Sequence, residues 1–187
     1  MCGIEISKKS LEIKVHEESA KDIENNQEYR YLLIKKWGKE DNIATVIMFN
    51  PSRASCLMYD KTVMNVENYL KIKKFNNVRI LNLYAIMGEN SNIIKNSNEK
   101  FERENDKYID KYIKDANKIF LAWGYGKENN GSEKVKDRIK KVTEMVKAYA
   151  ITHDIPVHGF IDDNEQNRMH PQNMNIYTWG DKVYWEK

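Results

Sequence analysis

Residues 43–52 read IATVIMFNPS, and this stretch sets the architecture of the chain. Its first seven residues are nearly all apolar, as a parallel strand must be when helices cover both faces of the sheet. Asn50-Pro51-Ser52 then ends the strand, because proline disfavours the helical conformation at Asn50. Ligands of open α/β sheets bind beyond the carboxyl ends of the strands. We therefore expect a functional pocket around Asn50, Pro51 and Ser52.

Three further buried strands are expected after this one. Apolar runs cover residues 78–84, 119–123 and 155–160, and a segment with helical spacing precedes each of them. Asp60 is placed to cap the first helix, because its carboxylate can accept a backbone N–H of the first turn. The expected helices cover residues 62–75, 99–116 and 132–150. This alternation predicts a three-layer α/β/α fold around a central four-stranded parallel sheet.

Antiparallel strands are expected at the N-terminal end. Leu11, Ile13 and Val15 alternate with polar residues, which predicts an exposed strand. Residues 29–34 predict a second strand, and the charged stretch 17–27 between them predicts a short polar helix or a loop.

The C-terminal end predicts a hairpin, with strands at 174–178 and 183–185 on either side of Gly180-Asp181. No linker or repeat divides the chain. We expect a single domain over residues 1–187, with a peripheral segment 1–28, a core 29–173 and the hairpin 174–187.

Composition narrows the class of protein. The formal net charge of +3 permits an anionic partner, but no basic stripe of a DNA-coating protein is present. No apolar run is long enough to cross a bilayer, and the polar start at Met1 is not a secretory signal. The sequence therefore predicts a cytoplasmic protein without a membrane partner.

Metal and cofactor chemistry is not expected. Cys2 and Cys56 are the only cysteines and form no C-x-x-C pair. The four histidines lack the spacing that would place two on one helical face, and no Walker lysine motif is present. The sequence predicts no metal site and no cofactor.

The residues that follow each buried strand are the candidates for ligand binding. Asn82 lies in an apolar strand, where a buried amide must find partners, either a nucleobase edge or a neighbouring backbone. Trp123 and Gly124 could bring a flat ring and a close backbone to a ligand, although a tryptophan there is more often part of the core.

A second group of candidates comes from a polar stretch near the C-terminus. His170-Pro171, with Arg168 nearby, could supply an electrophile or an anion contact, or could be an exposed loop. Asp60 is among the carboxylates nearest in sequence to these places and could be only a helix cap.

The order of these motifs resembles an uncharacterised bacterial and phage family, the domain of unknown function numbered sixteen forty-three. The resemblance covers roughly residues 30–173. It rests on seven blocks in order: Arg30-Tyr31-Leu32-Leu33 with Trp37, Ile47 to Ser52, Asp60 with Thr62, Asn82-Leu83-Tyr84-Ala85, Asn105-Asp106, Ala122-Trp123-Gly124, and Arg168 with His170-Pro171. The chain departs from the family at Arg53, Ser55, Met87 and Gln172-Asn173, so a ligand set by those positions would differ here.

The chain is also distantly similar to the uracil-DNA glycosylase superfamily, which implies the same α/β/α fold. Phe49-Asn50-Pro51-Ser52 is similar to that superfamily's G-I-N-P-G motif, Ile80-Leu81-Asn82 to L-L-N, and residues 119–124 to F-L-L-W-G. His170-Pro171 matches only the first half of H-P-S-P, and the serines that grip DNA phosphates are missing.

This similarity implies cleavage of an N-glycosidic bond. Asn50 would orient a water, His170 would donate to the departing base, and Asp60 would assist because an amide cannot accept the water's proton. Asn82 would hydrogen-bond the base. The remaining ligand-binding candidates are Pro51, Ser52, Arg53, Tyr59, Tyr84, Trp123, Gly124 and Arg168, of which Tyr59, Tyr84 or Trp123 would stack on the base.

Two functions remain open from the sequence. The first is a glycosylase-like protein that recognises a nucleobase and cleaves its N-glycosidic bond in DNA or in a nucleotide. The second is a non-catalytic pocket that captures a nucleotide or modified base, such as a phage or bacterial regulatory or defence-related sponge. The expected partners are a nucleobase, a nucleotide or DNA. A purely structural protein would require all these motifs to be accidental.

Overall fold

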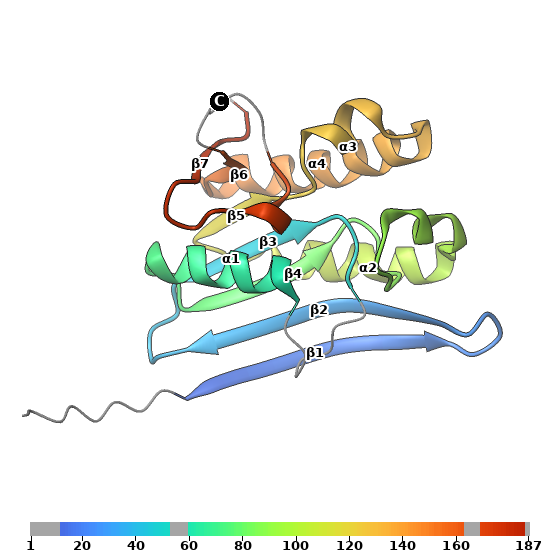
Figure 1. The fold of residues 1–187 in the computed structure, drawn as a ribbon, viewed down its shortest axis with the longest axis horizontal. Helices are drawn as coiled ribbons and strands as arrows, with labels where there is room; N and C mark the ends of the chain where they lie inside the picture. The colour runs from blue at the N-terminus through green and yellow to red at the C-terminus, as the bar shows by residue number, and fades with distance from the viewer. Residues whose placement is uncertain (1–11, 53–59, 163–168, 186–187) are drawn as a thin grey trace, which may run out of the picture.

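The computed structural model describes residues 12–52, 60–162 and 169–185 of the chain (Figure 1). The strands are β1 (Ile13–Asp22), β2 (Gln27–Trp37), β3 (Ile43–Met48), β4 (Asn77–Asn82), β5 (Lys118–Leu121), β6 (Val157–Ile161) and β7 (Gly180–Val183). The helices are α1 (Lys61–Ile72), α2 (Glu99–Tyr112), α3 (Tyr125–Asn130) and α4 (Glu133–His153), with short 3-10 turns η1 (Ser91–Asn96) and η2 (Pro171–Asn173).

All seven strands form one mixed sheet in the order β1-β2-β4-β3-β5-β6-β7. β4, β3, β5 and β6 run parallel to one another, whereas β1 pairs antiparallel with β2, β2 with β4, and β7 with β6. The four predicted parallel strands are present. The sheet has three more strands than predicted for its centre, because antiparallel strands extend it on both sides. β3 lies between β4 and β5, so the strand order reverses beside the end of β3.

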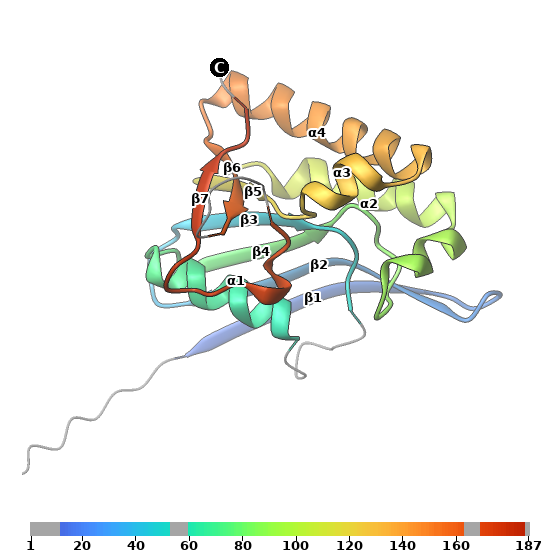
Figure 2. The same ribbon diagram turned by 45° about the horizontal axis from the view of Figure 1, so that its top comes forward.

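Helices cover both faces of the sheet, as Figure 2 shows. On one face α1 packs with Val63, Val66 and Leu70 against β3, β4 and β5. On the other face α2 and α4 bury a second apolar cluster that includes Ile109 and Val142. β3 contributes to both clusters, which explains why its sequence is apolar on both sides.

The start of α1 follows from its capping residue. Asp60 is extended at the N-cap, and its carboxylate accepts the backbone N–H of Val63 at 3.0 Å. This satisfies a donor that would otherwise have no partner at the helix start. The predicted cap at Asp60 is confirmed.

The N-terminal prediction needs a correction. The charged stretch is neither a helix nor a loop up to Asp22, because β1 continues to that residue as the outermost strand. One of its acidic residues has partners from α2: Glu18 accepts hydrogen bonds from the hydroxyls of Tyr108 at 2.6 Å and Tyr112 at 3.2 Å. Leu11 lies outside the described residues.

The predicted C-terminal hairpin is wrong. Gly180 and Asp181 do not form its turn but begin β7, which pairs antiparallel with β6 through Ile161–Gly180 and Phe160–Asp181. The buried carboxylate of Asp181 holds the strand in place through polar partners from three other elements. A turn signal in sequence was overridden by these tertiary contacts.

No helix in the described part of the chain is long and apolar enough to span a membrane.

Candidate functional site

A pocket of about 1080 Å³ lies beyond the carboxyl ends of the parallel strands. Parallel strands end at one edge of the sheet, so the segments that follow them converge there. Each of the four strands contributes to its lining: Phe49 and Asn50 after β3, Glu89, Asn90, Asn92, Ile94 and Lys95 after β4, Trp123, Gly124 and Lys127 after β5, and Met169, His170 and Gln172 after β6. The beginning of α4, with Ser132 and Lys134, completes the wall.

Asn50 lines this pocket with its amide held in one orientation. Its Nδ2 donates to the carbonyl of Gly88 at 3.0 Å and to that of Pro51 at 3.3 Å. The N–H of Gly88 returns a bond to the Pro51 carbonyl at 2.9 Å, which ties the two loops together. Because both amide protons have acceptors, the side chain offers its Oδ1 to a ligand or a water.

His170 also lines the pocket and presents a hydrogen-bond donor. Its Nδ1 accepts the backbone N–H of Gln172 at 3.2 Å, so the neutral imidazole carries its proton on Nε2. Burial lowers the pKa of His170, and the charge of Lys127 lowers it further, while Asp60 acts in the opposite direction. A neutral histidine with an N–H donor is the result.

Two residues fix the position of His170. Gly124 has a φ of +84°, and a Cβ there would lie 3.0 Å from the backbone nitrogen of His170. A side chain at this position would therefore push the histidine away. From the other side, buried Asn65 on α1 donates its Nδ2 to the carbonyls of Pro171 at 3.0 Å and Gln172 at 3.2 Å.

Sequence reasoning missed Asn65. It lies four residues before Tyr69 and so shares the buried face of α1. A polar residue at such a position is the signal that could have found it.

Asp60, Pro51 and Ser52, which were also predicted as site residues, are not among the described residues that line the pocket. Asp60 caps α1 and reaches His170 only electrostatically. Pro51 is buried and contributes its carbonyl to the bond with Gly88. Ser52 has a buried hydroxyl with no hydrogen-bond partner. Arg53, Tyr59 and Arg168 lie outside the described residues.

Asn82, at the end of β4, is not among the residues that line this pocket. Its side chain is 1% exposed, and its Oδ1 has no hydrogen-bond partner. Strand alternation with Ile80 places it on the face covered by α1, next to Met48 of β3. A buried amide oxygen without a partner is an acceptor that a ligand could satisfy.

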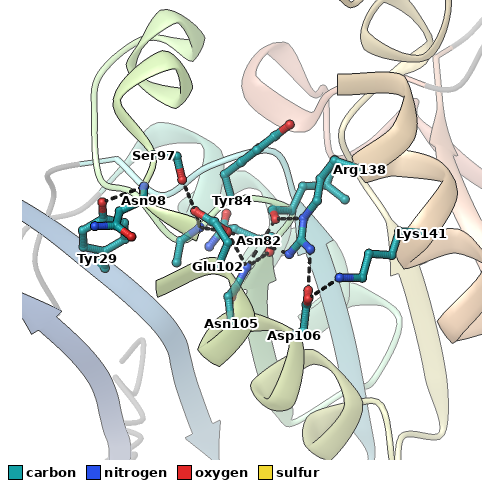
Figure 3. A network of polar contacts seen from close by, with 12 residues as sticks. Tyr29, Asn82, Tyr84, Ser97, Asn98, Glu102, Asn105, Asp106, Arg138 and Lys141 are labelled. Carbon is teal, nitrogen blue, oxygen red and sulfur yellow. Dashed lines mark hydrogen bonds and ion pairs between the residues drawn. The ribbon is translucent and has the colours of Figure 1, made fainter. Parts of the chain in front are cut away.

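A polar network fixes the backbone that leaves β4 (Figure 3). Buried Asn105 donates to the carbonyl of Asn82 at 3.0 Å, and Glu102 accepts the N–H of Ala85 at 3.1 Å. Arg138 of α4 donates its Nε to the carbonyl of Leu83 at 2.6 Å and forms an ion pair with Asp106. Burial raises the pKa of Glu102, while its hydrogen bond from Ser97 and the charge of Arg138 oppose this.

Tyr84 belongs to this region rather than to the main pocket. Its hydroxyl donates to the carbonyl of Lys134 at 3.3 Å, and burial raises its pKa to about 12. It lines a smaller hollow of about 370 Å³ together with Glu102 and Arg138.

Trp123 lines the pocket but is only 1% exposed and packs edge-on against Tyr184. It belongs mainly to the core, which was the alternative left open by the sequence. The ring forms a wall of the pocket instead of an exposed stacking surface.

The pocket is rich in positive charge. Among the described residues of its lining are Lys95, Lys127 and Lys134 and one carboxylate, that of Glu89. The ammonium of Lys127 lies 4.6 Å from the ring centroid of Phe49, a cation–π contact. These lysines could not be predicted as pocket residues, because lysine is abundant throughout the chain.

The described residues contain no group of three or more histidines, cysteines or carboxylates that could hold a metal ion.

Comparison with known families gives one match. Residues 30–172, which make up more than half of the chain, match the model of a family described as "protein of unknown function (DUF1643)". A comparison with curated proteins and one with solved structures each found no match.

Proposed function

Because the chain belongs to the DUF1643 family, whose description gives no function, we propose from the pocket itself that the protein recognises a nucleobase with its sugar. The observation that carries this proposal is the pairing of Asn50 and His170 in one pocket beyond β3. One residue offers an acceptor and the other a neutral donor, and both are oriented by backbone contacts.

A nucleobase matches this pairing. Bases carry carbonyl oxygens that accept from an imidazole N–H, and ring or exocyclic N–H groups that donate to an amide oxygen. A volume of about 1080 Å³ is ample for a nucleoside and is at the upper end of small-molecule pockets.

The same pair supports cleavage of the N-glycosidic bond, the chemistry of the uracil-DNA glycosylase superfamily that the motif order resembles. Water held by the Oδ1 of Asn50 would attack the anomeric carbon, and the bond to the base nitrogen would break with its electron pair going to the base. The N–H of His170 would stabilise the negative charge on the base oxygen. The water's proton would pass to solvent or to the departing base.

Capture without cleavage is the second candidate, and the position of Asp60 favours it. Asparagine cannot accept a proton, and the carboxylate of Asp60 is engaged in capping α1. Within the described lining of the pocket, Glu89 is the one carboxylate. A binding protein needs no general base, so this lining suits it as well.

Mass spectrometry of released base tests the proposal. Wild type and Asn50→Ala would be incubated with a panel of modified oligonucleotides, nucleotides and nucleosides. Base released by wild type and not by the variant would establish a glycosidase that uses Asn50. Intact ligand that remains bound, with no base released, would leave the capture function. Neither release nor binding with any member would contradict the proposal.

A further inference from the structure

We propose that Glu102 and Arg138 are positioning residues for Asn50, because together they fix the segment whose Gly88 carbonyl orients the Asn50 amide. The inference rests on the proposed function and deepens it, since it concerns how the acceptor of the pocket is held. Neither Glu102 nor Arg138 lines the pocket that contains Asn50. Both act through the backbone that leaves β4.

This backbone changes partners twice before it reaches the pocket. It first continues along β3, where the N–H of Tyr84 donates to the carbonyl of Phe49 at 3.0 Å. It then pairs with β2, where the carbonyl of Ala85 accepts the N–H of Arg30 at 2.8 Å. Gly88 finally returns to the loop that follows β3. The change from β3 to β2 therefore falls between Tyr84 and Ala85.

Glu102 of α2 and Arg138 of α4 bind the backbone on the two sides of this change (Figure 3). Arg138 donates its Nε to the carbonyl of Leu83 at 2.6 Å, a carbonyl that also accepts from Asn105 at 3.3 Å. Glu102 accepts the N–H of Ala85 with both carboxylate oxygens at 3.1 Å. Because Ala85 is fully buried, removal of Glu102 would leave this N–H without water to replace it.

The two side chains also contact each other. Nη2 of Arg138 lies 3.8 Å from Oε2 of Glu102, and both side chains are largely buried. Desolvation of such a pair offsets much of the attraction between its charges, so it adds little net stability. The directed bonds to two backbone groups are what the pair supplies.

Gly88 carries the effect to the pocket. It lies three residues beyond Ala85, its N–H donates to the carbonyl of Pro51 at 2.9 Å, and its carbonyl accepts the Nδ2 of Asn50 at 3.0 Å. Since a separation of about 3.6 Å is no longer a hydrogen bond, a displacement of roughly half an ångström is enough to release the Asn50 amide. The Oδ1 that faces a ligand would then lose its fixed direction.

Nuclear magnetic resonance of the Asn50 side-chain amide tests the inference without a ligand. Its cross-peaks would be assigned by their loss in Asn50→Ala. Glu102→Ala should move them toward the positions of exposed asparagine amides and speed their exchange with solvent about tenfold, the factor that corresponds to one hydrogen bond. Glu102→Gln should restore the wild-type positions, because its amide oxygen can again accept the Ala85 N–H. Arg138→Gln should give a smaller shift in the same direction and serves if Glu102→Ala does not fold.

Two controls separate positioning from a general loss of stability. Asp181→Asn weakens the attachment of β7, which three strands of the sheet separate from β4, and should leave the Asn50 cross-peaks in place. Asp110→Asn removes an exposed charge from α2 and should do the same. Unmoved cross-peaks in both Glu102→Ala and Arg138→Gln would overturn the inference and assign the segment's geometry to its pairing with β2. An equal movement in Asp181→Asn would overturn it as well.

A double-mutant cycle connects the positioning role to ligand binding. Calorimetry with adenosine, guanosine, cytidine, uridine and thymidine would compare wild type, Glu102→Ala, Asn50→Ala and the double variant. For a nucleoside that binds wild type, Glu102→Ala should lose about tenfold in affinity but almost nothing further in the Asn50→Ala background. Additive losses would contradict an effect that passes through Asn50. Absence of binding to all five would contradict recognition of an unmodified nucleoside, whereas the Asn50 cross-peaks decide the positioning role in either case.

Discussion

Two partly buried histidines of this chain have opposite surroundings. His158 on β6 contacts the carboxylate of Asp181, which also accepts hydrogen bonds from Lys118 and from the hydroxyl of Tyr69 at 2.6 Å. His170 has no carboxylate among its hydrogen-bond partners; its Nδ1 accepts a backbone N–H, and the ring lines the large pocket.

The difference separates a structural cluster from a candidate binding site. In the Asp181 cluster, defined by Tyr69, Lys118, His158 and Asp181, each charge has a protein partner and β7 is fixed to the sheet. In the pocket, His170 is oriented by the backbone while its second nitrogen remains for a ligand. The two histidines thus differ in their ring nitrogens: a carboxylate engages the ring of His158, whereas Nε2 of His170 can donate a hydrogen bond to a ligand.

The largest effect on stability is expected from the Asp181 cluster. Asp181→Asn should lower the free energy of unfolding by about 3 kcal/mol, because it leaves Lys118 largely buried without its counter-charge. Thermal denaturation would show a fall of roughly 2–4 °C per kcal/mol for a chain of this size. Asp110→Asn, which breaks an exposed pair with Lys114, is the control and should cost less than about 1 kcal/mol. Equal melting temperatures for the two variants would contradict the structural role of the cluster.

A substitution at Gly124 tests whether the pocket depends on the close approach of Gly124 to His170. Gly124→Ala should cost about 1–3 kcal/mol, because φ is +84° and the new Cβ would meet the backbone of His170. Nucleotide binding should fall as well, since the histidine must move. Gly126→Ala is the matched control for stability alone, because a Cβ there meets nothing within 4 Å but Gly126 itself lines the pocket. Binding would be measured by calorimetry and stability by thermal melts. Unchanged stability and affinity in Gly124→Ala would contradict a requirement for close packing between Gly124 and His170.

Asn65 should matter for both stability and binding. Asn65→Ala leaves the carbonyls of Pro171 and Gln172 without their donor and should cost about 1–2 kcal/mol. It should also weaken ligand binding, because the turn that carries His170 loses its contact with α1. Asn68→Ala on the same helix serves as the control, since Asn68 is exposed. Loss of stability with unchanged affinity would show that the turn is positioned by other contacts.

The Asp181 cluster predicts a pH dependence of stability. Burial alone would raise the pKa of Asp181, but its bonds to His158, Lys118 and Tyr69 together hold the pKa well below its ordinary value of 3.8. A carboxylate with a lowered pKa stabilises the fold above 3.8, and this contribution is lost as the pH falls below that value. The stability difference between wild type and Asp181→Asn should therefore be constant near neutrality and shrink below about pH 4. Urea denaturation at pH 7 and pH 3 measures it, and a difference that stays constant would contradict the assignment.

The sequence predicted the centre of the fold better than its edges. β3, β4, β5 and β6 were found because strands covered on both faces are apolar on both faces, a local property of the chain. Asp60 was predicted as a cap because its carboxylate accepts a backbone N–H only three residues away, which is also a local property of the chain. The exposed strand predicted at Ile13 and Val15 is the start of β1. Its polar continuation to Asp22 and the strand β7 were not predicted, because they depend on tertiary partners: Tyr108 and Tyr112 for Glu18, and the Asp181 cluster for β7.

The structure brings some of the predicted site residues together in one pocket, and their role in binding stays a prediction. Asn50, Gly124 and His170 meet in one pocket because parallel strands end at one edge of the sheet. The expected contact of Asn82 with a base did not take account of strand alternation, which turns its side chain to the face covered by α1. The sequence could not show that the hydroxyl of Tyr84 donates to the carbonyl of Lys134 instead. Nor could it distinguish the pocket lysines from the many lysines elsewhere on the surface.

The most direct test of the account is a comparison of His170→Ala with His158→Ala, in which nucleotide affinity by calorimetry and melting temperature are both measured. His170→Ala should lose about tenfold or more in affinity, as expected for a lost donor to a base, and melt within a few degrees of wild type. His158→Ala should melt clearly lower and, at a temperature where it is folded, bind as wild type does. Unchanged affinity in His170→Ala, or an equal loss in both variants, would contradict the assignment of the pocket.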